Sequence, residues 1–149
     1  MAWIILYLYE KGYRNFLFFV NSKNIIEKTK DNFLNDTSNK YLFWKEIRLW
    51  DKIVYIKEVD NFTSNNKEDI QIKFTTIQGL HMDLNNPKEN SITYEDFDDN
   101  EVVIISDEAH HINSLTKSKL SSDEKNEKKS WEYTVLKILN KHIKNLLLE

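Results

Sequence analysis

Two carboxylates and two imidazoles directly follow a short apolar run in the second half of the chain. The run is Val102 to Ile105, and Asp107, Glu108, His110 and His111 come just after it. An apolar run without polar alternation is typical of a parallel strand that is buried on both faces. Open α/β sheets bind their ligands beyond the carboxyl ends of such strands. One carboxylate there can hold hydrated Mg²⁺ while the other orients or deprotonates an attacking water, so the spacing indicates the acidic half of a nucleoside triphosphatase site.

A second strand-to-helix junction precedes this one in the chain. Asn15 to Val20 is a continuous apolar run and predicts another buried parallel strand. A helix is expected to follow it as far as Leu34, with Ser22 or Asn24 as the cap and Glu27 completing a capping box with Asn24. This part of the chain therefore predicts one β-α unit.

A third junction lies between these two. Ile70 to Thr75 alternates apolar and polar residues and predicts a strand, and the segment from Thr76 to about Leu84 predicts a helix. The opening segment, Ala2 to Lys11, is expected to be a buried helix that ends at Gly12. Alternating strands and helices imply right-handed crossovers and an α/β fold, a three-layer sandwich with a mainly parallel sheet.

The segments between the junctions predict surface structure. Lys40 to Val59 is expected to form a short hairpin or an edge extension, in which Trp44 and Trp50 either pack against the protein or stack on bases. Asp60 to Asp69 predicts a surface loop. Asn90 to Asn100 is acidic and predicts a connecting segment anchored by its aromatic residues.

The last part of the chain predicts a loop, a helix and the start of a strand. Residues 114–130 are highly charged without periodicity, which predicts a mobile surface loop. Ser130 can cap a final helix, whose inner stripe would include Val135 and Ile138. The apolar run Leu146 to Leu148 then predicts the beginning of another strand.

Three blocks of the sequence resemble a known family. Asp107 to His110 spell DEAH, a form of the Walker B motif (motif II) of superfamily 2 helicases. GYRNFLFFVNSKNIIEKTKDNFL (Gly12 to Leu34, with the motif at about 16–34) and FTTIQGLH (Phe74 to His81) resemble motifs Ia and Ib of the motor subunit of type III restriction enzymes. The order and spacing of the blocks also fit, so the resemblance covers nearly the whole chain. It implies a RecA-like domain of the P-loop NTPase type.

The resemblance implies roles for individual residues. Asp107 would be the Mg²⁺ ligand, Glu108 would polarise the attacking water, and His110 would couple the nucleotide state to a second motor domain. Small polar residues at the two earlier junctions would contact the nucleic-acid backbone: Asn21, Ser22, Thr75, Thr76 and Gln78. Ordinary helix capping explains these polar residues equally well, and the two interpretations are compatible.

One required part of the chemistry is missing from the sequence. The phosphate-binding motif G-x-x-x-x-G-K-[ST] needs two glycines five positions apart, but the two glycines of this chain are Gly12 and Gly79. In the family that the chain resembles, this loop lies just upstream and motif III just downstream. The chain is therefore expected to be a partial first motor domain, incomplete at both ends and inactive alone, from a parent enzyme that uses ATP and Mg²⁺.

Composition limits the classes of function. The chain has 149 residues, 40% of them hydrophobic, a net charge of −3 and no cysteine, which predicts one soluble globular domain and is compatible with the cytoplasm. The negative charge argues against a wholly basic nucleic-acid-binding surface. The apolar opening is too short to span a bilayer, so no membrane partner is expected. The partners that the resemblance implies are double-stranded DNA and the modification (methyltransferase) subunit of a restriction complex.

Two other functions remain open from the sequence. The chain can be a non-catalytic remnant or a binding module with the same fold. It can also be a small metal-dependent hydrolase, with zinc held by Asp107, His110 and His111 together with His81 or His142. Adjacent histidines rarely bind one ion, and the H-E-x-x-H spacing is absent, so the motor interpretation is preferred.

Overall fold

The fold comes from a computed structural model that describes residues 1–20, 22–44, 46–63, 68–106 and 132–148. Its centre is a five-stranded sheet with the order β4-β5-β1-β6-β7, in which every neighbouring pair is parallel. The strands are β1 (Asn15–Val20), β4 (Ile56–Glu58), β5 (Ile70–Thr76), β6 (Val102–Ser106) and β7 (Leu146–Leu148). The predicted α/β class with a mainly parallel sheet is confirmed.

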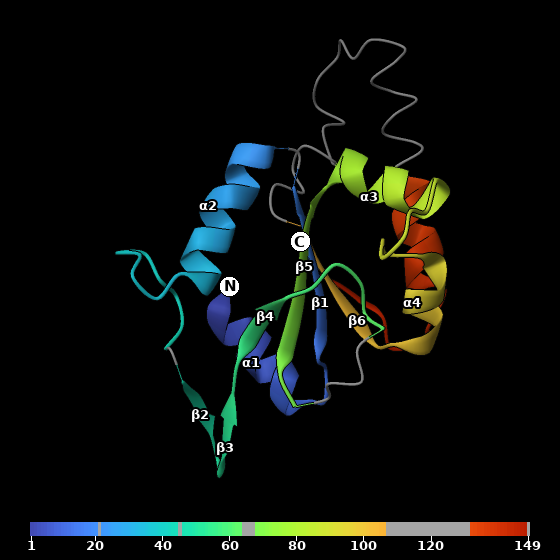
Figure 1. The fold of residues 1–149 in the computed structure, drawn as a ribbon. Coiled ribbons are helices and arrows are strands. Elements are labelled where there is room, and N and C mark those ends of the chain that lie inside the picture. Colours follow the sequence, from blue (N-terminus) through green and yellow to red (C-terminus); the bar gives the residue numbers. More distant parts are fainter. Residues whose placement is uncertain (21, 45, 64–67, 107–131, 149) are drawn as a thin grey trace, which may run out of the picture.

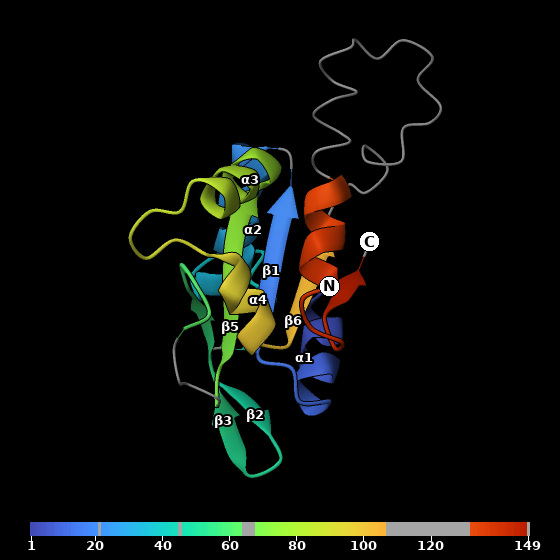
Figure 2. The ribbon, with the colours of Figure 1, turned by 90° about the vertical axis from the view of Figure 1, so that its right-hand side faces the viewer.

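Helices cover both faces of this sheet (Figure 1). One face carries α1 (Ala2–Glu10) and α2 (Lys23–Leu34). The other carries α3 (Ile77–Asn85), α4 (Tyr94–Asp99) and the helical residues 132–139, and the view in Figure 2 looks onto this second face. The result is a three-layer sandwich with a RecA-like arrangement, as the sequence predicts.

Strand β1 shows how one segment supplies both cores. All six of its residues are buried, and successive side chains point to opposite faces of the sheet. Phe16 and Phe18 enter the core under α1 and α2, whereas Leu17 and Phe19 enter the core under α3 and α4. A strand between two helical layers favours apolar residues on both faces, and this explains the apolar run from Phe16 to Val20.

Helix α1 ends where the sequence predicts, but it is not a fully buried helix. Gly12 follows the helix with a φ of +107°, a conformation that suits glycine, and its N–H donates to the carbonyl of Tyr9 at 3.0 Å. Ile5 is fully buried, whereas Trp3 and Tyr7 are 68% and 47% exposed. The expected burial holds for one side of the helix only, because α1 lies on the sheet surface.

Helix α2 begins at one of the two predicted caps. Ser22 occupies the N-cap position, with φ −121° and ψ 129°, but its side chain makes no capping hydrogen bond. The predicted capping box of Asn24 and Glu27 is wrong, because Asn24 lies inside the first helical turn. Ile26 and Phe33 of this helix are buried against the sheet.

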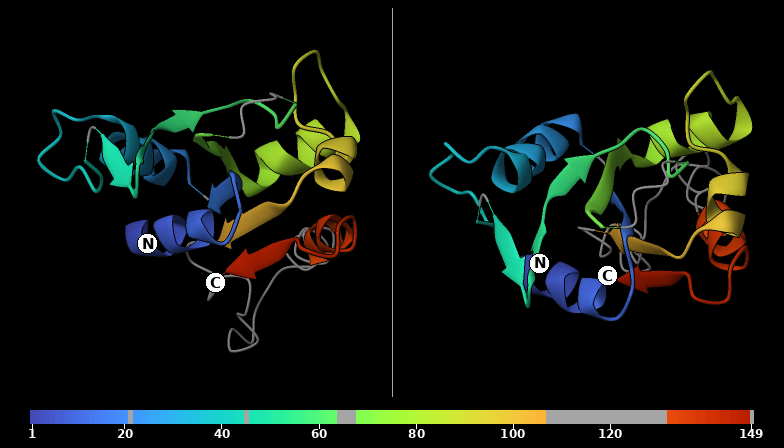
Figure 3. Two further views of the ribbon diagram at one scale, coloured as in Figure 1. Left: turned by 90° about the horizontal axis from the view of Figure 1, so that it is seen from below. Right: turned by 60° about the horizontal axis from the view of Figure 1, so that its bottom comes forward.

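The segment from 40 to 59 contains both structures that the sequence allows. β2 (Ile47–Leu49) and β3 (Lys52–Val54) form an antiparallel hairpin, and β4 then pairs in parallel with β5 at the edge of the large sheet. The hairpin projects from the end of the molecule opposite α3 (Figures 1 and 3). Trp44 and Trp50 are 85% and 90% exposed, so the expectation that they pack against the protein is wrong.

Helix α4 is an element that the sequence analysis missed. Thr93 and Asp96 form a capping box at its start, and Phe97 anchors it in the core with no exposed surface. The predicted loop before β5 has neither helix nor strand at residues 60–63 and 68–69, but Phe62 within it is buried against Phe97. The buried Phe62 side chain therefore anchors this loop to the core beneath α4.

The end of the chain agrees with prediction where it is described. Residues 132–139 are helical with Val135 and Ile138 buried, and β7 pairs with β6. The predicted mobile loop at 114–130 lies outside the described residues. Among the helices that are described, none is long and apolar enough to cross a membrane.

Candidate functional site

The carboxyl ends of three neighbouring strands lie level with one another. In the register of the sheet Phe19 of β1 pairs with Thr75 of β5 on one side and with Ser106 of β6 on the other. The three junctions that the sequence singles out therefore meet at one edge of the sheet. Of the predicted site residues, Ser22, Thr75, Thr76 and Gln78 are described, whereas Asn21, Asp107, Glu108 and His110 lie outside the described residues.

The start of α2 presents backbone N–H groups at this edge. The Ser22 carbonyl accepts hydrogen bonds from the N–H groups of Ile25 and Ile26, both at 3.2 Å, and so starts the helix without using the hydroxyl. No acidic residue lies in the first turn, and the first helical residue is the exposed Lys23. A cation is unfavourable at a helix N-terminus unless an anion is bound there. Lys23 was not among the site residues predicted from the sequence. Its position directly after the predicted cap Ser22 could have indicated a cation at the helix N-terminus.

At the start of α3, unlike at the start of α2, side-chain hydroxyl groups make local hydrogen bonds. The Thr76 hydroxyl accepts a hydrogen bond from the Gly79 N–H at 3.0 Å, and the buried Thr75 hydroxyl donates to the Thr76 carbonyl at 3.2 Å. Both threonine hydroxyls therefore serve the local structure. Gln78 is exposed on the first turn, which again holds no acidic residue. Contact with a phosphate at this junction would thus come from Gln78 and the helix N–H groups.

Gly79 allows the two threonines to lie against the helix. A Cβ atom at this position would lie 2.9 Å from the Thr75 hydroxyl oxygen and 3.0 Å from that of Thr76. Glycine therefore lets the start of α3 lie close to both threonine side chains.

Ser106, at the tip of β6, has a buried hydroxyl group. The residue is 4% exposed, and its oxygen has no hydrogen-bond partner within the described part of the chain. A buried hydroxyl without a partner costs about 1–3 kcal/mol, so its retention indicates a partner. Ser106 directly precedes Asp107 in the sequence. Ser106 was not among the site residues predicted from the sequence. Its position as the polar residue that ends an apolar run could have indicated a place at the edge of the sheet.

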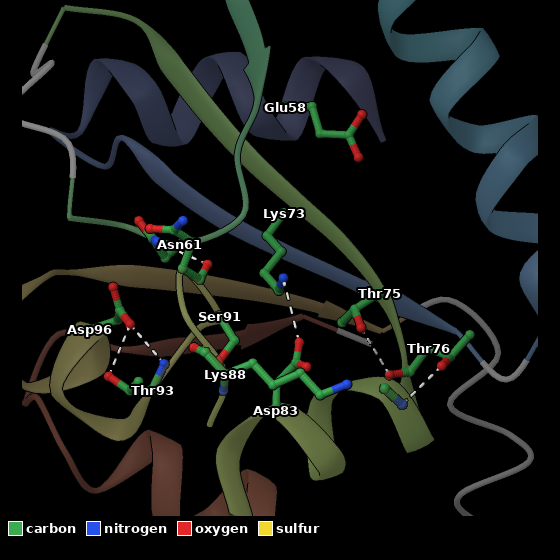
Figure 4. A network of polar contacts seen from close by, with 12 residues as sticks. Glu58, Asn61, Lys73, Thr75, Thr76, Asp83, Lys88, Ser91, Thr93 and Asp96 are labelled. Carbon is green, nitrogen blue, oxygen red and sulfur yellow. Dashed lines mark hydrogen bonds and ion pairs between the residues drawn. The ribbon is translucent and has the colours of Figure 1, made fainter. Parts of the chain in front are cut away.

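A buried ion pair lies on the α3 side of the sheet, next to Thr75 (Figure 4). The Lys73 ammonium is 3.7 Å from a carboxylate oxygen of Asp83, and the two side chains are 10% and 32% exposed. This pair joins β5 to α3 and so helps to orient the helix that carries Gln78. The polar residues of β5, including Gln71, are buried, because helices cover this face as well.

The described residues contain no group of three side chains that could hold a metal ion. His81 lies 3.3 Å from the Thr134 hydroxyl, and the His142 Nδ1 accepts a hydrogen bond from the Lys144 N–H at 3.2 Å. The two histidines that the zinc hypothesis adds to the DEAH segment are thus held in separate hydrogen-bonded positions.

A parallel sheet between two helical layers, with polar junctions at the carboxyl ends of adjacent strands, defines a RecA-like α/β domain. The sequence model of the family described as "Type III restriction enzyme, res subunit" matches residues 1–149, and the chain belongs to this family.

A curated relative agrees with this assignment. The chain is 43% identical over 166 aligned residues to the probable type III restriction-modification enzyme HindVIP Res subunit of Haemophilus influenzae. The match covers 100% of this chain and 32% of that protein, so the chain spans about a third of its relative. No solved structure matches the chain significantly.

Proposed function

We propose that the chain provides part of the first motor domain of an ATP-driven DNA translocase of the type III restriction class. The observation that carries this proposal is the level register of β1, β5 and β6, which brings three polar junctions to one edge of the sheet. Family membership supports it, because the matching relative is a restriction-modification subunit. The partners that the proposal implies are double-stranded DNA and a modification subunit.

The residues that we propose to act on the nucleotide follow β6 at this edge of the sheet. When bound, ATP with Mg²⁺ supplies the phosphoryl group that is transferred to water. Asp107 would hold the metal through water, Glu108 would orient and polarise the attacking water, and His110 would relay the nucleotide state to the second motor domain. The buried Ser106 hydroxyl supports a polar environment here, because it needs a partner at the strand tip.

The residues that we propose to contact DNA follow β1 and β5 at the same edge of the sheet. Two helix N-termini without acidic residues in their first turns are suited to phosphate oxygens, since their N–H groups and dipoles attract anions. Ser22, Lys23 and Gln78 would add side-chain contacts, with Asn21 next to them in the sequence. Such contacts fix the position of a strand without reading its base sequence.

Binding to duplex DNA tests the DNA half. A Lys23→Ala, Gln78→Ala double variant is expected to bind a fluorescent duplex about tenfold more weakly than the unmodified chain at low salt, with a shallower dependence of affinity on salt concentration. Lys88→Ala, which removes an exposed lysine from the loop after α3, is the control and should leave binding unchanged. Equal binding by the double variant and the unmodified chain would contradict the proposed contacts.

ATP turnover tests the nucleotide half. These 149 residues contain no G-x-x-x-x-G-K-[ST] pattern, so the chain alone is expected to show no ATPase activity with or without DNA. Hydrolysis that Glu108→Gln abolishes would show that the chain binds the phosphates in another way. The missing pattern also favours a second candidate function, a binding module that holds DNA without turnover. A longer protein that contains this chain and hydrolyses ATP would exclude that candidate.

A further inference from the structure

The β2–β3 hairpin presents two tryptophans that contribute little to the fold. Trp44 is 85% exposed just before the hairpin, and Trp50 is 90% exposed at its turn. Tryptophan contributes most to stability when its ring is buried, and large exposed apolar groups usually mark a binding surface. Leu42, Ile53 and Tyr55 add exposed apolar surface to the same region, with 44–48% of each residue exposed.

The backbone of Trp50 is strained. The hairpin has a two-residue turn, because Leu49 pairs with Lys52, and Trp50 takes the first turn position with a φ of +56°. A two-residue turn with a positive φ at its first position favours glycine there, and a bulky side chain in the left-handed region costs about 1–2 kcal/mol. A tryptophan that is both strained and exposed here is therefore better explained by contact with another molecule than by folding.

A cavity lies next to Trp44, between the end of α2 and the hairpin. It has a volume of about 230 Å³, and the residues that line it include Phe33, Tyr41, Trp44 and Tyr55. This volume admits one planar ring the size of a nucleobase. Trp44 and Tyr55 are 85% and 44% exposed, so their rings can offer surface for stacking beside the cavity.

The charge of this region differs from that of the whole chain. Residues 40–57 contain five lysine or arginine residues and two acidic residues, a net charge of +3 in a chain of net charge −3. Arg48 and Lys52 form ion pairs with Glu46 and Glu68 at 3.3 Å and 3.2 Å, but both cationic side chains stay highly exposed, at 76% and 67%. Exposed pairs of this kind contribute little, so the cations can move to a phosphate.

We infer that this surface binds a single-stranded segment of nucleic acid. Bases stack on Trp44 and Trp50 and in the cavity, and the phosphates lie near Lys40, Arg48 and Lys52. An unpaired strand is required, because stacking on a side chain needs an open base face. A protein partner would also cover apolar rings, but the exposed cations Lys40, Arg48 and Lys52 next to the two tryptophans favour a polyanion. The hairpin lies at the opposite end of the molecule from α3, so this inference is independent of the proposed DNA contacts there.

Fluorescence anisotropy with labelled oligodeoxythymidylate tests the inference. The unmodified chain should bind this probe with an affinity that falls as salt rises, and a Trp44→Ala, Trp50→Ala variant should bind it about tenfold more weakly or worse. Trp3→Ala is the matched control, since Trp3 is also highly exposed but lies on α1. It should leave binding unchanged. A Trp44→Phe, Trp50→Phe variant should retain most of the affinity, because phenylalanine still stacks.

Several results would overturn the inference. They are the absence of oligonucleotide binding, binding that survives the double alanine substitution in a variant with an unchanged circular dichroism spectrum, and, in the Lys23→Ala, Gln78→Ala variant, equal affinity for the oligonucleotide and for a duplex of the same length. Self-association that depends on the two tryptophans, without oligonucleotide binding, would identify the hairpin as a protein interface instead. Loss of duplex binding in the Lys23 and Gln78 variant leaves this test unaffected, so the two proposals fail separately.

Discussion

The two faces of the central sheet are stabilised in different ways. The face under α1 and α2 is packed with apolar and aromatic side chains, whereas the face under α3 and α4 also buries polar residues that bond across elements. Packing tolerates small shifts, but a buried hydrogen bond is lost when its partners move apart. The difference indicates that the second face fixes the orientation of helices, including the one that carries Gln78.

The aromatic cluster of the first face centres on Phe33 of α2. Its ring lies 5.2 Å from that of Phe43, 5.8 Å from that of Phe74 and 6.3 Å from that of Phe18, measured between ring centroids. These rings join α2 to β1, to β5 and to the segment before the hairpin. Helix α2 is thus held on the sheet mainly by ring packing.

The polar connections of the second face centre on Asn145. Its side-chain oxygen accepts a hydrogen bond from the Val102 N–H at 2.9 Å, and its side-chain nitrogen donates to the carbonyls of Phe97 and Ile138 at 3.3 Å and 3.0 Å. One amide therefore joins β6 to α4 and to the helix at 132–139. Asp96 acts in a similar way, because it accepts hydrogen bonds from the N–H groups of Phe62 and Thr93.

The largest expected effect is on the apolar face. Phe33→Ala should lower the free energy of unfolding by about 3–5 kcal/mol, because it removes a buried ring and leaves a cavity beneath α2. Urea denaturation measures this loss. Tyr133→Ala, which removes a ring that is 67% exposed, is the control and should change stability by less than about 0.5 kcal/mol. A loss below about 1 kcal/mol for Phe33→Ala would show that ring packing does not hold this face together.

A smaller effect is expected on the polar face. Asn145→Ala should lower the free energy of unfolding by about 2–3 kcal/mol, because it removes the acceptor of the buried Val102 N–H and one hydrogen bond from each of two carbonyl groups. The exposed Asn140→Ala is the matched control, with little expected change. Hydrogen exchange should also accelerate at Val102 in the first variant only. An unchanged hydrogen-exchange rate at Val102 would mean that the Asn145 side chain does not hold the start of β6 in place.

The smallest effect concerns polar contacts on the outside of α2. The side chains of Asn35 and Ser38 both donate hydrogen bonds to Asp31 at 2.7 Å, and they hold the pKa of this carboxyl below its ordinary value of 3.8. A lowered pKa in the folded state means that the contribution to stability is present above the ordinary value and is lost as the pH falls through the folded pKa. Asn35→Ala should raise the pKa of Asp31 in an NMR titration, with little change in stability because the group is exposed. An unchanged pKa would rule out Asn35 as the main cause.

Sequence patterns predicted the strands and junctions better than the connections between them. The apolar runs of β1 and β6 could be recognised because strands that are buried on both faces usually have few polar positions. Helix α4 was missed because its acidic sequence resembles a loop, although Thr93 and Asp96 already had capping-box spacing. The alternation in β5 gave no sign that its polar residues are buried, because covering by α3 depends on the tertiary fold.

The candidate site was predictable in position and less so in detail. Two apolar runs and one alternating segment, each followed by polar residues, predicted parallel strands, and the register shows that the carboxyl ends of these strands are level. The engagement of Thr75 and Thr76 in local hydrogen bonds and the buried Ser106 hydroxyl depend on side-chain packing, which no spacing rule encodes. The roles of Asn21, Asp107, Glu108 and His110 stay predictions.

The register of β1 also limits how the two halves of the proposed site can influence each other. Both neighbours of this strand are hydrogen-bonded to it along nearly its whole length. A slip of one residue would exchange Phe16 and Phe18 with Leu17 and Phe19 between the two cores, so both cores would have to repack. We therefore expect the three strands to move as one unit. A displacement at the tip of β6 would then shift the starts of α2 and α3 together.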